Sequence, residues 1–288
     1  MQIDDLAVRI STHALLSCGL AASALAVGAI SAESNRFCYL DEFCDPYYVG
    51  TDFPKLTTPQ WVGEPGVDAV VVLAIDDMRQ SEPYEVYLRP ILDRLKQIDG
   101  RAAVSIMTNE AKPSDEQLQR WLAEGVSIEV HTLDHPCPLL KDGDFPKAFD
   151  TYTRCIDLLE TIPGNRAVAF RMPCCDSLNS PSPRFYAETF SKRTANDNFL
   201  AVDSSIFNII TANDQQLPRE WVVHDDGTPR FEKYVPFKSF VNTIENYPYP
   251  YVIGNTCWEF PCMVPSDWQA QNLQQPNNPN TVRDWQTA

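Results

Sequence analysis

Residues 69–77 read AVVVLAIDD. The apolar run over 69–75 is unbroken and rich in β-branched side chains, and Asp68 and Asp76 bound it. Such a run is typical of a strand buried on both faces, as in a parallel sheet that is covered by helices. We therefore expect a buried strand here, with Asp76 and Asp77 at its carboxyl end.

Strands and helices are expected to alternate after this run. Apolar residues at helical spacing predict helices over 85–98, 114–124, 148–162 and 183–192. Short apolar stretches predict strands over 102–107, 126–130, 167–170, 199–202 and 251–253. Ser114 and Gln117 are expected to form a capping box. This alternation implies parallel strands with right-handed crossovers, and we predict an α/β fold, a distorted parallel (β/α) barrel of about seven strands.

Polar residues follow the expected strands at one common point. Asp76 and Asp77 end the first strand, His131 ends the third, Arg171 the fourth and Asp203 the fifth. In a parallel barrel these strand ends share one rim, which is where active sites form. The sequence thus predicts that these side chains meet.

Residues 131–135 read HTLDH and place two imidazoles four residues apart. On one turn of helix such residues face the same way, so both rings could reach one metal ion. The alternative is two unrelated histidines. Because the whole chain has four histidines, the pairing of two at this spacing favours a metal site.

The adjacent carboxylates of Asp76 and Asp77 allow a division of work. One could complete a His-His-carboxylate metal site, while the other stays free as a general base that takes a proton from water. The alternative is a turn that ends the strand, or a helix N-cap.

Four short motifs resemble those of the polysaccharide deacetylase family, the carbohydrate esterases that share the NodB homology domain. AIDD at 74–77 is similar to the family's Thr-Phe-Asp-Asp, and HTLDH at 131–135 matches its His-Ser/Thr-x-x-His. RMPC at 171–174 is similar to Arg-x-Pro-Tyr/Phe, and DSS at 203–205 to a looser fourth motif. The resemblance covers residues 68–205.

The resemblance implies roles for five residues. Asp76 would be the general base, and Asp77, His131 and His135 would hold one divalent metal, with Zn²⁺ as the default ion. Arg171 would orient Asp76. The implied activity is a metal-dependent hydrolase that removes acetyl groups from an acetylated polysaccharide, an N-acetylglucosamine polymer such as peptidoglycan or a chitin-like chain.

Four residues are expected to contact the substrate: Pro173, Cys174, Asp203 and Trp258. Cys174 stands where the family has an aromatic residue. Trp258 could stack on a sugar ring, although packing under the rim is the more frequent fate of such a side chain.

The chain departs from the family at its late histidine. Only His224 follows Arg171, and its neighbours do not resemble the family's Leu-x-x-His. We expect a barrel that lacks its last helix and strand. The alternative function is therefore a catalytically silent carbohydrate- or partner-binding remnant of the same fold.

The acidic composition restricts the partners. The chain has 39 acidic and 23 basic side chains, for a formal net charge of −16. Because a strongly negative protein repels phosphate backbones and anionic lipid, we expect no nucleic acid partner. A stable membrane partner is not expected either, apart from an N-terminal anchor.

Four segments are expected along the chain. Residues 14–32 carry no charge and are rich in small and apolar side chains, so 1–32 is predicted to be a signal peptide or an N-terminal anchor. An N-terminal extension over 33–66, the deacetylase-like barrel domain over 67–268 and a polar tail over 269–288 would follow.

An exported protein is expected, in the periplasm, in the cell envelope or secreted. The chain has nine cysteines, with Cys38 near Cys44 and Cys257 near Cys262. Export would allow some of them to form disulfides. The connectivity cannot be read from the sequence.

Overall fold

The computed structural model describes residues 71–175, 181–234, 243–253 and 257–263. The expected signal or anchor, the N-terminal extension and the C-terminal tail lie outside these residues.

The main sheet has seven strands in the order β1-β2-β3-β4-β5-β9-β8. All neighbouring pairs are parallel except β8 with β9. The strands are β1 (Leu73–Met78), β2 (Val104–Thr108), β3 (Ser127–Val130), β4 (Ala169–Phe170), β5 (Val202–Asp203), β8 (Tyr251–Ile253) and β9 (Cys257–Glu259). The predicted α/β class with a mostly parallel sheet is confirmed. Within the described residues, β1 and β8 form the two edges of the sheet, so the barrel is not closed.

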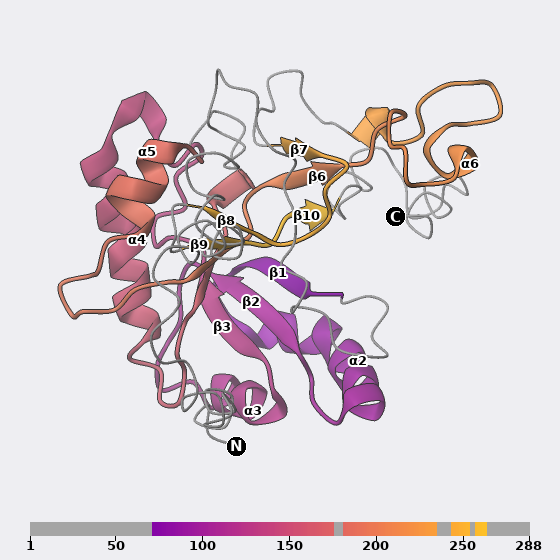
Figure 1. Cartoon of the computed structure of the whole chain (residues 1–288). Helices are drawn as coiled ribbons and strands as arrows, with labels where there is room; N and C mark the ends of the chain where they lie inside the picture. Colours follow the sequence, from indigo (N-terminus) through magenta and orange to yellow (C-terminus); the bar gives the residue numbers. More distant parts are fainter. Residues whose placement is uncertain (1–70, 176–180, 235–242, 254–256, 264–288) are drawn as a thin grey trace, which may run out of the picture.

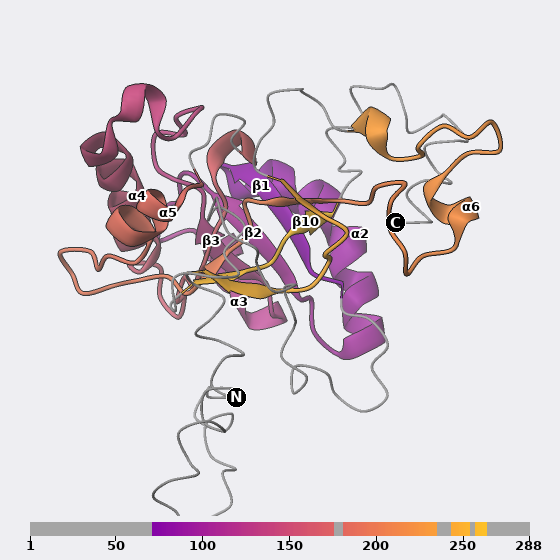
Figure 2. The same ribbon diagram turned by 45° about the horizontal axis from the view of Figure 1, so that its top comes forward.

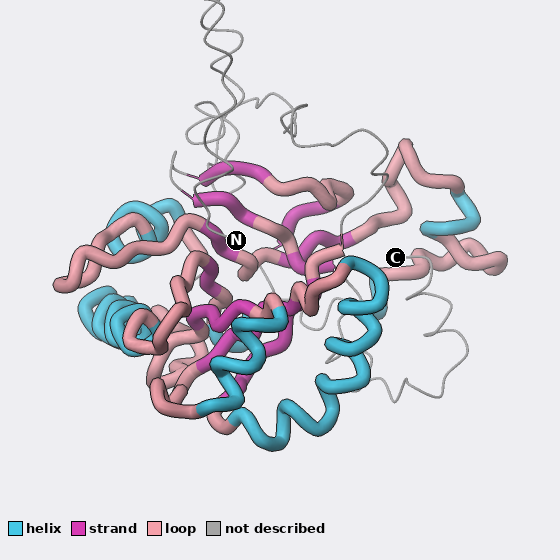
Figure 3. Tube along the Cα trace, turned by 90° about the horizontal axis from the view of Figure 1, so that it is seen from below, coloured by secondary structure: helices cyan, strands magenta, loops and turns pink. Residues whose placement is uncertain are grey.

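Helices join the first strands, as predicted. They are α2 (Ser81–Asp99), α3 (Glu116–Glu124), α4 (Phe145–Leu159) and the short α5 (Pro183–Phe185), which continues into η5 (Tyr186–Phe190). Figures 1 and 2 show α4 and α5 on one side of the sheet and α2 on the other. Seen from below, the strands run through the middle of the molecule with helices around them (Figure 3).

The ends of α3 follow from local chemistry. Asp115 is the N-cap, and its carboxylate accepts the Gln117 N–H at 2.8 Å. The prediction of a capping box between Ser114 and Gln117 is therefore wrong, because the N-cap is Asp115. Gly125 ends the helix with φ 103°, a left-handed conformation that favours glycine.

The prediction that β1 is buried on both faces is wrong. Leu73 is 38% exposed, and Val71 and Val72 before it are 80% and 61% exposed. The reason is topological, because among the described residues β1 pairs with β2 alone and lies at an edge of the sheet. The β-branched run identified a strand correctly but not its place in the sheet.

A second, three-stranded sheet was not predicted. It consists of β10 (Cys262–Met263), β6 (Phe207–Ile209) and β7 (Thr243–Glu245), in that order and all parallel. It has its own small core, which includes Val222 from α6 (Arg219–Val222). Among the helices of the described residues, none combines the length and apolar character needed to cross a membrane.

Candidate active site

The two neighbouring carboxylates at the end of β1 have different partners. Oδ1 of Asp77 lies 2.9 Å from Nε2 of His135 and 3.5 Å from Nε2 of His131. Oδ1 of Asp76 instead accepts a hydrogen bond from Nη1 of Arg171 at 3.2 Å. The pairing of β1 with β2 is irregular between Ile75 and Met78, and Asp77 has φ 67°. This local irregularity sets the directions of the two side chains.

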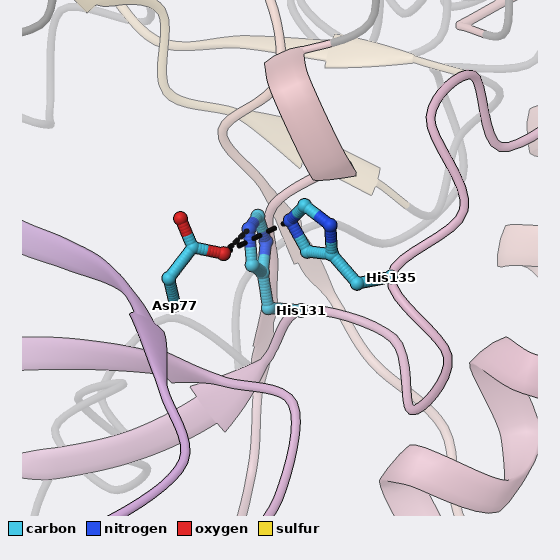
Figure 4. Close-up of side chains that lie close together, drawn as sticks. All are labelled: Asp77, His131 and His135. Carbon is cyan, nitrogen blue, oxygen red and sulfur yellow. Dashed lines mark ion pairs between the residues drawn. The ribbon is translucent and has the colours of Figure 1, made fainter.

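The two histidines come from the loop that follows β3, not from a helix as predicted. Thr132 and His135 have φ 60° and 47°, so the chain turns sharply between the two rings. The ring centroids lie 5.0 Å apart. Figure 4 shows Asp77 from β1 pointing at both imidazoles. The fold thus brings the three predicted ligands together by a different local structure from the one expected.

Left-handed backbone is concentrated in the segments around the site. Asp77, Thr132, His135 and Cys174 are all non-glycine residues with positive φ. Thr132 is the most unusual of them because its side chain is β-branched. Each such residue costs on the order of 1–3 kcal/mol and persists only where its surroundings fix it.

These three side chains fit a divalent metal. One ligand atom from each of Asp77, His131 and His135 lies within 4.8 Å of the others. Nδ1 of His131 lies 2.7 Å from the carbonyl oxygen of Arg171. Because a carbonyl oxygen only accepts, Nδ1 donates this hydrogen bond, and Nε2 is the ring nitrogen that faces Asp77. A metal-binding histidine commonly has this second hydrogen bond.

The electrostatics of Asp77 agree with this arrangement. Hydrogen bonds from His131, the larger effect, and from His135 hold the pKa of the Asp77 carboxyl well below its usual range. Partial burial acts in the opposite direction and raises this pKa. The side chain of Asp77 is 62% exposed, whereas His131 is almost fully buried. The side chains of Asp77, His131 and His135 therefore form a site that is open to solvent on the Asp77 side.

Arg171 is held at two points while it reaches Asp76. Its Nε donates to the carbonyl oxygen of Ser204 at 2.9 Å, and its Nη2 donates to the Ser204 hydroxyl at 2.9 Å. The Ser204 hydroxyl in turn donates to the carbonyl oxygen of Phe260 at 2.7 Å. In the sequence, Ser204 is part of the loose fourth motif, and no role was predicted for it.

The family model for polysaccharide deacetylase matches residues 63–182. This stretch is similar to the polysaccharide deacetylase family. It contains Asp76, Asp77, both site histidines and Arg171.

Two solved structures are similar to this chain. One is peptidoglycan deacetylase PdaC from Bacillus subtilis, with 28% identity, a TM-score of 0.29, and coverage of 36% of this chain and 49% of that one. The other is a family 4 carbohydrate esterase from Streptomyces lividans in complex with acetate, with 15% identity, a TM-score of 0.35, and coverage of 50% and 66%. This chain therefore spans about half the length of the PdaC structure (49%). No curated protein matches the chain.

Asp203 is fully buried, so the predicted contact with substrate does not fit this structure. Its carboxylate accepts hydrogen bonds from the Tyr186 hydroxyl (2.6 Å), the Ser204 N–H (2.8 Å) and the Ser205 hydroxyl (2.5 Å). Asp203 therefore shapes the turn that holds Arg171.

Glu259 is the neighbour of Asp203 across the β5–β9 pair, and it is also fully buried. Burial, together with the nearby Asp203 charge, raises the pKa of Glu259 well above its usual range. Two adjacent buried carboxyls cannot both ionise easily. Burial therefore disfavours ionisation of Glu259 more strongly than that of Asp203, whose carboxylate accepts three hydrogen bonds.

Of the other three predicted substrate contacts, Pro173 and Cys174 lie in the turn after Arg171, and Trp258 lies in β9. Cys174 is exposed and forms a disulfide with Cys137. Pro173 is buried, and Trp258 is half-buried and packs against the main core. Cys257 and Cys262 do not form a disulfide with each other. The disulfide, which the sequence did not reveal, joins the loop of His135 to the loop after Arg171.

Proposed function

We propose that this chain is a metal-dependent hydrolase that removes acetyl groups from an acetylated polysaccharide. The observation that carries the proposal is the separation of the two carboxylates. Asp77 lies with the imidazoles of His131 and His135 within 4.8 Å. Asp76, the preceding residue, is turned to Arg171 instead. This is the division between metal ligand and general base that hydrolysis of an acetyl group needs.

Each residue then has a separate task. Asp77, His131 and His135 would hold a divalent ion, Zn²⁺ by default for this donor set, and the ion would polarise the acetyl carbonyl and acidify water. Asp76 would take the proton of the attacking water, with Arg171 on Oδ1 fixing its orientation. The bond from the acetyl carbon to the sugar nitrogen or oxygen would break, the proton would pass to the leaving atom, and acetate would depart.

The family match supports a polysaccharide substrate. We propose an N-acetylglucosamine polymer such as peptidoglycan or a chitin-like chain, and no nucleic acid partner, in line with the net charge of −16. We also propose that the protein is exported. The Cys137–Cys174 disulfide supports this, because such bonds persist in oxidising compartments.

A silent carbohydrate- or partner-binding protein of the same fold is the second candidate. One observation favours it. His224, the histidine that follows Arg171 in the chain, lies in the turn after α6. Its backbone N–H donates to the carbonyl oxygen of Thr228 at 2.8 Å. Its surroundings do not identify it as the acid that protonates the leaving group.

One pair of measurements decides between the two candidates. Purified protein should hold about one equivalent of divalent metal, and it should release acetate from an acetylated chitooligosaccharide. Asp76→Asn should lower kcat by at least about 100-fold, since it removes the general base, and should leave the metal bound. His131→Ala with His135→Ala should abolish metal binding.

Asp142→Asn is the control, because Asp142 lies on an exposed turn in η3 (Lys141–Gly143) and belongs to no part of the site. Metal bound without acetate release would favour the silent protein. Absence of bound metal would refute the enzyme proposal.

A further inference from the structure

Asn109 lies directly between the two backbone segments that carry the candidate metal ligands. It follows β2, which pairs with β1 on one side and β3 on the other. β1 supplies Asp77, and the loop after β3 supplies His131 and His135. Asn109 itself is 1% exposed, and sequence analysis gave it no role.

The Asn109 side chain is bonded to the histidine loop. Its Nδ2 donates to the carbonyl oxygens of His131 at 2.8 Å and Thr132 at 3.0 Å. Both partners are carbonyls, which only accept, so the atom that faces them must be the amide nitrogen. The two bonds fix the peptide groups on either side of Thr132, the buried residue whose φ is 60°.

The same short segment is bonded to β1. The N–H of Asn109 donates to the carbonyl oxygen of Met78 at 3.2 Å, and the Thr108 hydroxyl donates to that oxygen at 2.5 Å. Met78 is the residue after Asp77. The N–H of His131 donates to the carbonyl oxygen of Thr108 at 3.1 Å. Thr108 and Asn109 therefore connect the backbone next to Asp77 with the backbone of the first histidine.

We propose that Asn109 is a positioning residue that sets the distance between Asp77 and the histidine pair, and thereby the affinity of the site for a divalent metal. The inference rests on the proposed metal-dependent function. Asn109 is not a ligand. It acts by holding the left-handed turn at Thr132 in the orientation that points His131 and His135 at Asp77.

Asn109→Asp is the sharpest test because it keeps the shape of the side chain. It replaces the donating amide with a carboxylate oxygen, which would repel the carbonyl oxygens of His131 and Thr132. Asn109→Ala removes the donor without adding charge. Asn165→Asp is the matched control: Nδ2 of Asn165 also donates to two carbonyl oxygens, those of Ile128 and Leu159, at 3.1 and 3.2 Å, and neither belongs to the site.

The affinity of the metal-free proteins for Zn²⁺ is measured by calorimetry, with folding checked by circular dichroism. We expect both Asn109 variants to bind about 10- to 100-fold more weakly than the wild type. Asn165→Asp should bind within about 3-fold of the wild type, although its melting temperature falls.

Each other outcome overturns the inference. Folded Asn109 variants with wild-type affinity would show that Asn109 does not position the site. If Asn165→Asp weakened Zn²⁺ binding as much as the Asn109 variants do, the loss of affinity would come from a general loss of stability. Failure of both Asn109 variants to fold, while Asn165→Asp folds, would show that Asn109 serves folding and not the metal site. Absence of binding by the wild type would remove the proposed metal function itself, so the two failures can be told apart.

Discussion

Two adjacent aspartates have different partners because different side chains surround them. The Arg171 guanidinium lies on Asp76, and the two imidazoles lie on Asp77. Without these partners, two neighbouring carboxylates would repel each other. The orientation of Arg171 depends in turn on Ser204, which accepts two of its hydrogen bonds.

Replacing Ser204 with alanine tests this dependence. Ser204→Ala leaves the bond from Nε of Arg171 to the backbone but removes the bond from Nη2 to the hydroxyl. A hydrogen bond to a charged group contributes roughly 1.5–3 kcal/mol. We expect kcat for acetate release to fall at least about 10-fold with little change in KM, because about 1.4 kcal/mol corresponds to a factor of ten.

Ser105→Ala is the control for this experiment. Ser105 lies in β2, and its hydroxyl accepts a hydrogen bond from Ser127 at 3.1 Å, so the same chemical change occurs away from Arg171. Equal kcat values for Ser204→Ala and Ser105→Ala would contradict the anchoring role.

At the scale of elements, the buried Glu129 adds hydrogen bonds to the pairing of β3 with β4. β4 has two residues, and Val130 pairs with Phe170. Oε2 of Glu129 accepts the N–H groups of Val168 and Ala169, both at 2.8 Å. Burial raises the pKa of Glu129 to about 7, even though these two hydrogen bonds favour the charged form.

The raised pKa of Glu129 predicts the pH dependence of stability. The folded pKa of about 7 exceeds the ordinary 4.5, so the folded state binds the proton more tightly. The contribution of Glu129 to the free energy of unfolding is fully present below pH 4.5 and is lost as the pH rises through 7. The loss is at most about 3 kcal/mol for this group.

Urea unfolding between pH 4.5 and 8.5 measures this effect. The difference in the free energy of unfolding between wild type and Glu129→Gln isolates the contribution of Glu129, because glutamine does not titrate. The advantage of the wild type over the variant should shrink as the pH rises. Parallel pH profiles for the two proteins would show that Glu129 is not the responsible group.

At the scale of the whole molecule, the apolar runs and the helical periodicity of the sequence were sufficient to predict most of the main sheet. Apolar runs and helical periodicity identified β1 to β5 and the helices between them, so the meeting of Asp76, Asp77, His131 and Arg171 followed from parallel pairing. The strands β6, β7 and β10 have two or three residues each. β4 and β5 are equally short, but each ends an apolar stretch, over 167–170 and 199–202. No such stretch marks β7 or β10, so the second sheet was not predicted.

Contacts between distant segments account for the remaining errors. The turn at Thr132 is held by Asn109, which lies 23 residues earlier, so local spacing suggested a helix instead. Asp203 is buried because Tyr186 and Ser205 satisfy its carboxylate, although aspartate is usually exposed. The partner of Cys174 lies 37 residues away, in a segment with no distinguishing spacing.

The Cys137–Cys174 disulfide joins the two loops that carry the site, so stability and metal binding should respond together to its loss. In the chain-entropy account, a bond that closes a loop of this length (37 residues apart) contributes about 3–4 kcal/mol. Replacing both cysteines with alanine should lower the free energy of unfolding by that amount and weaken Zn²⁺ binding, because the loop of His135 loses its tie. A phosphine reductant, which converts the disulfide to two thiols, should also lower the free energy of unfolding of the wild type. A double variant as stable as the oxidised wild type, with the same affinity for Zn²⁺, would mean that other contacts hold these loops.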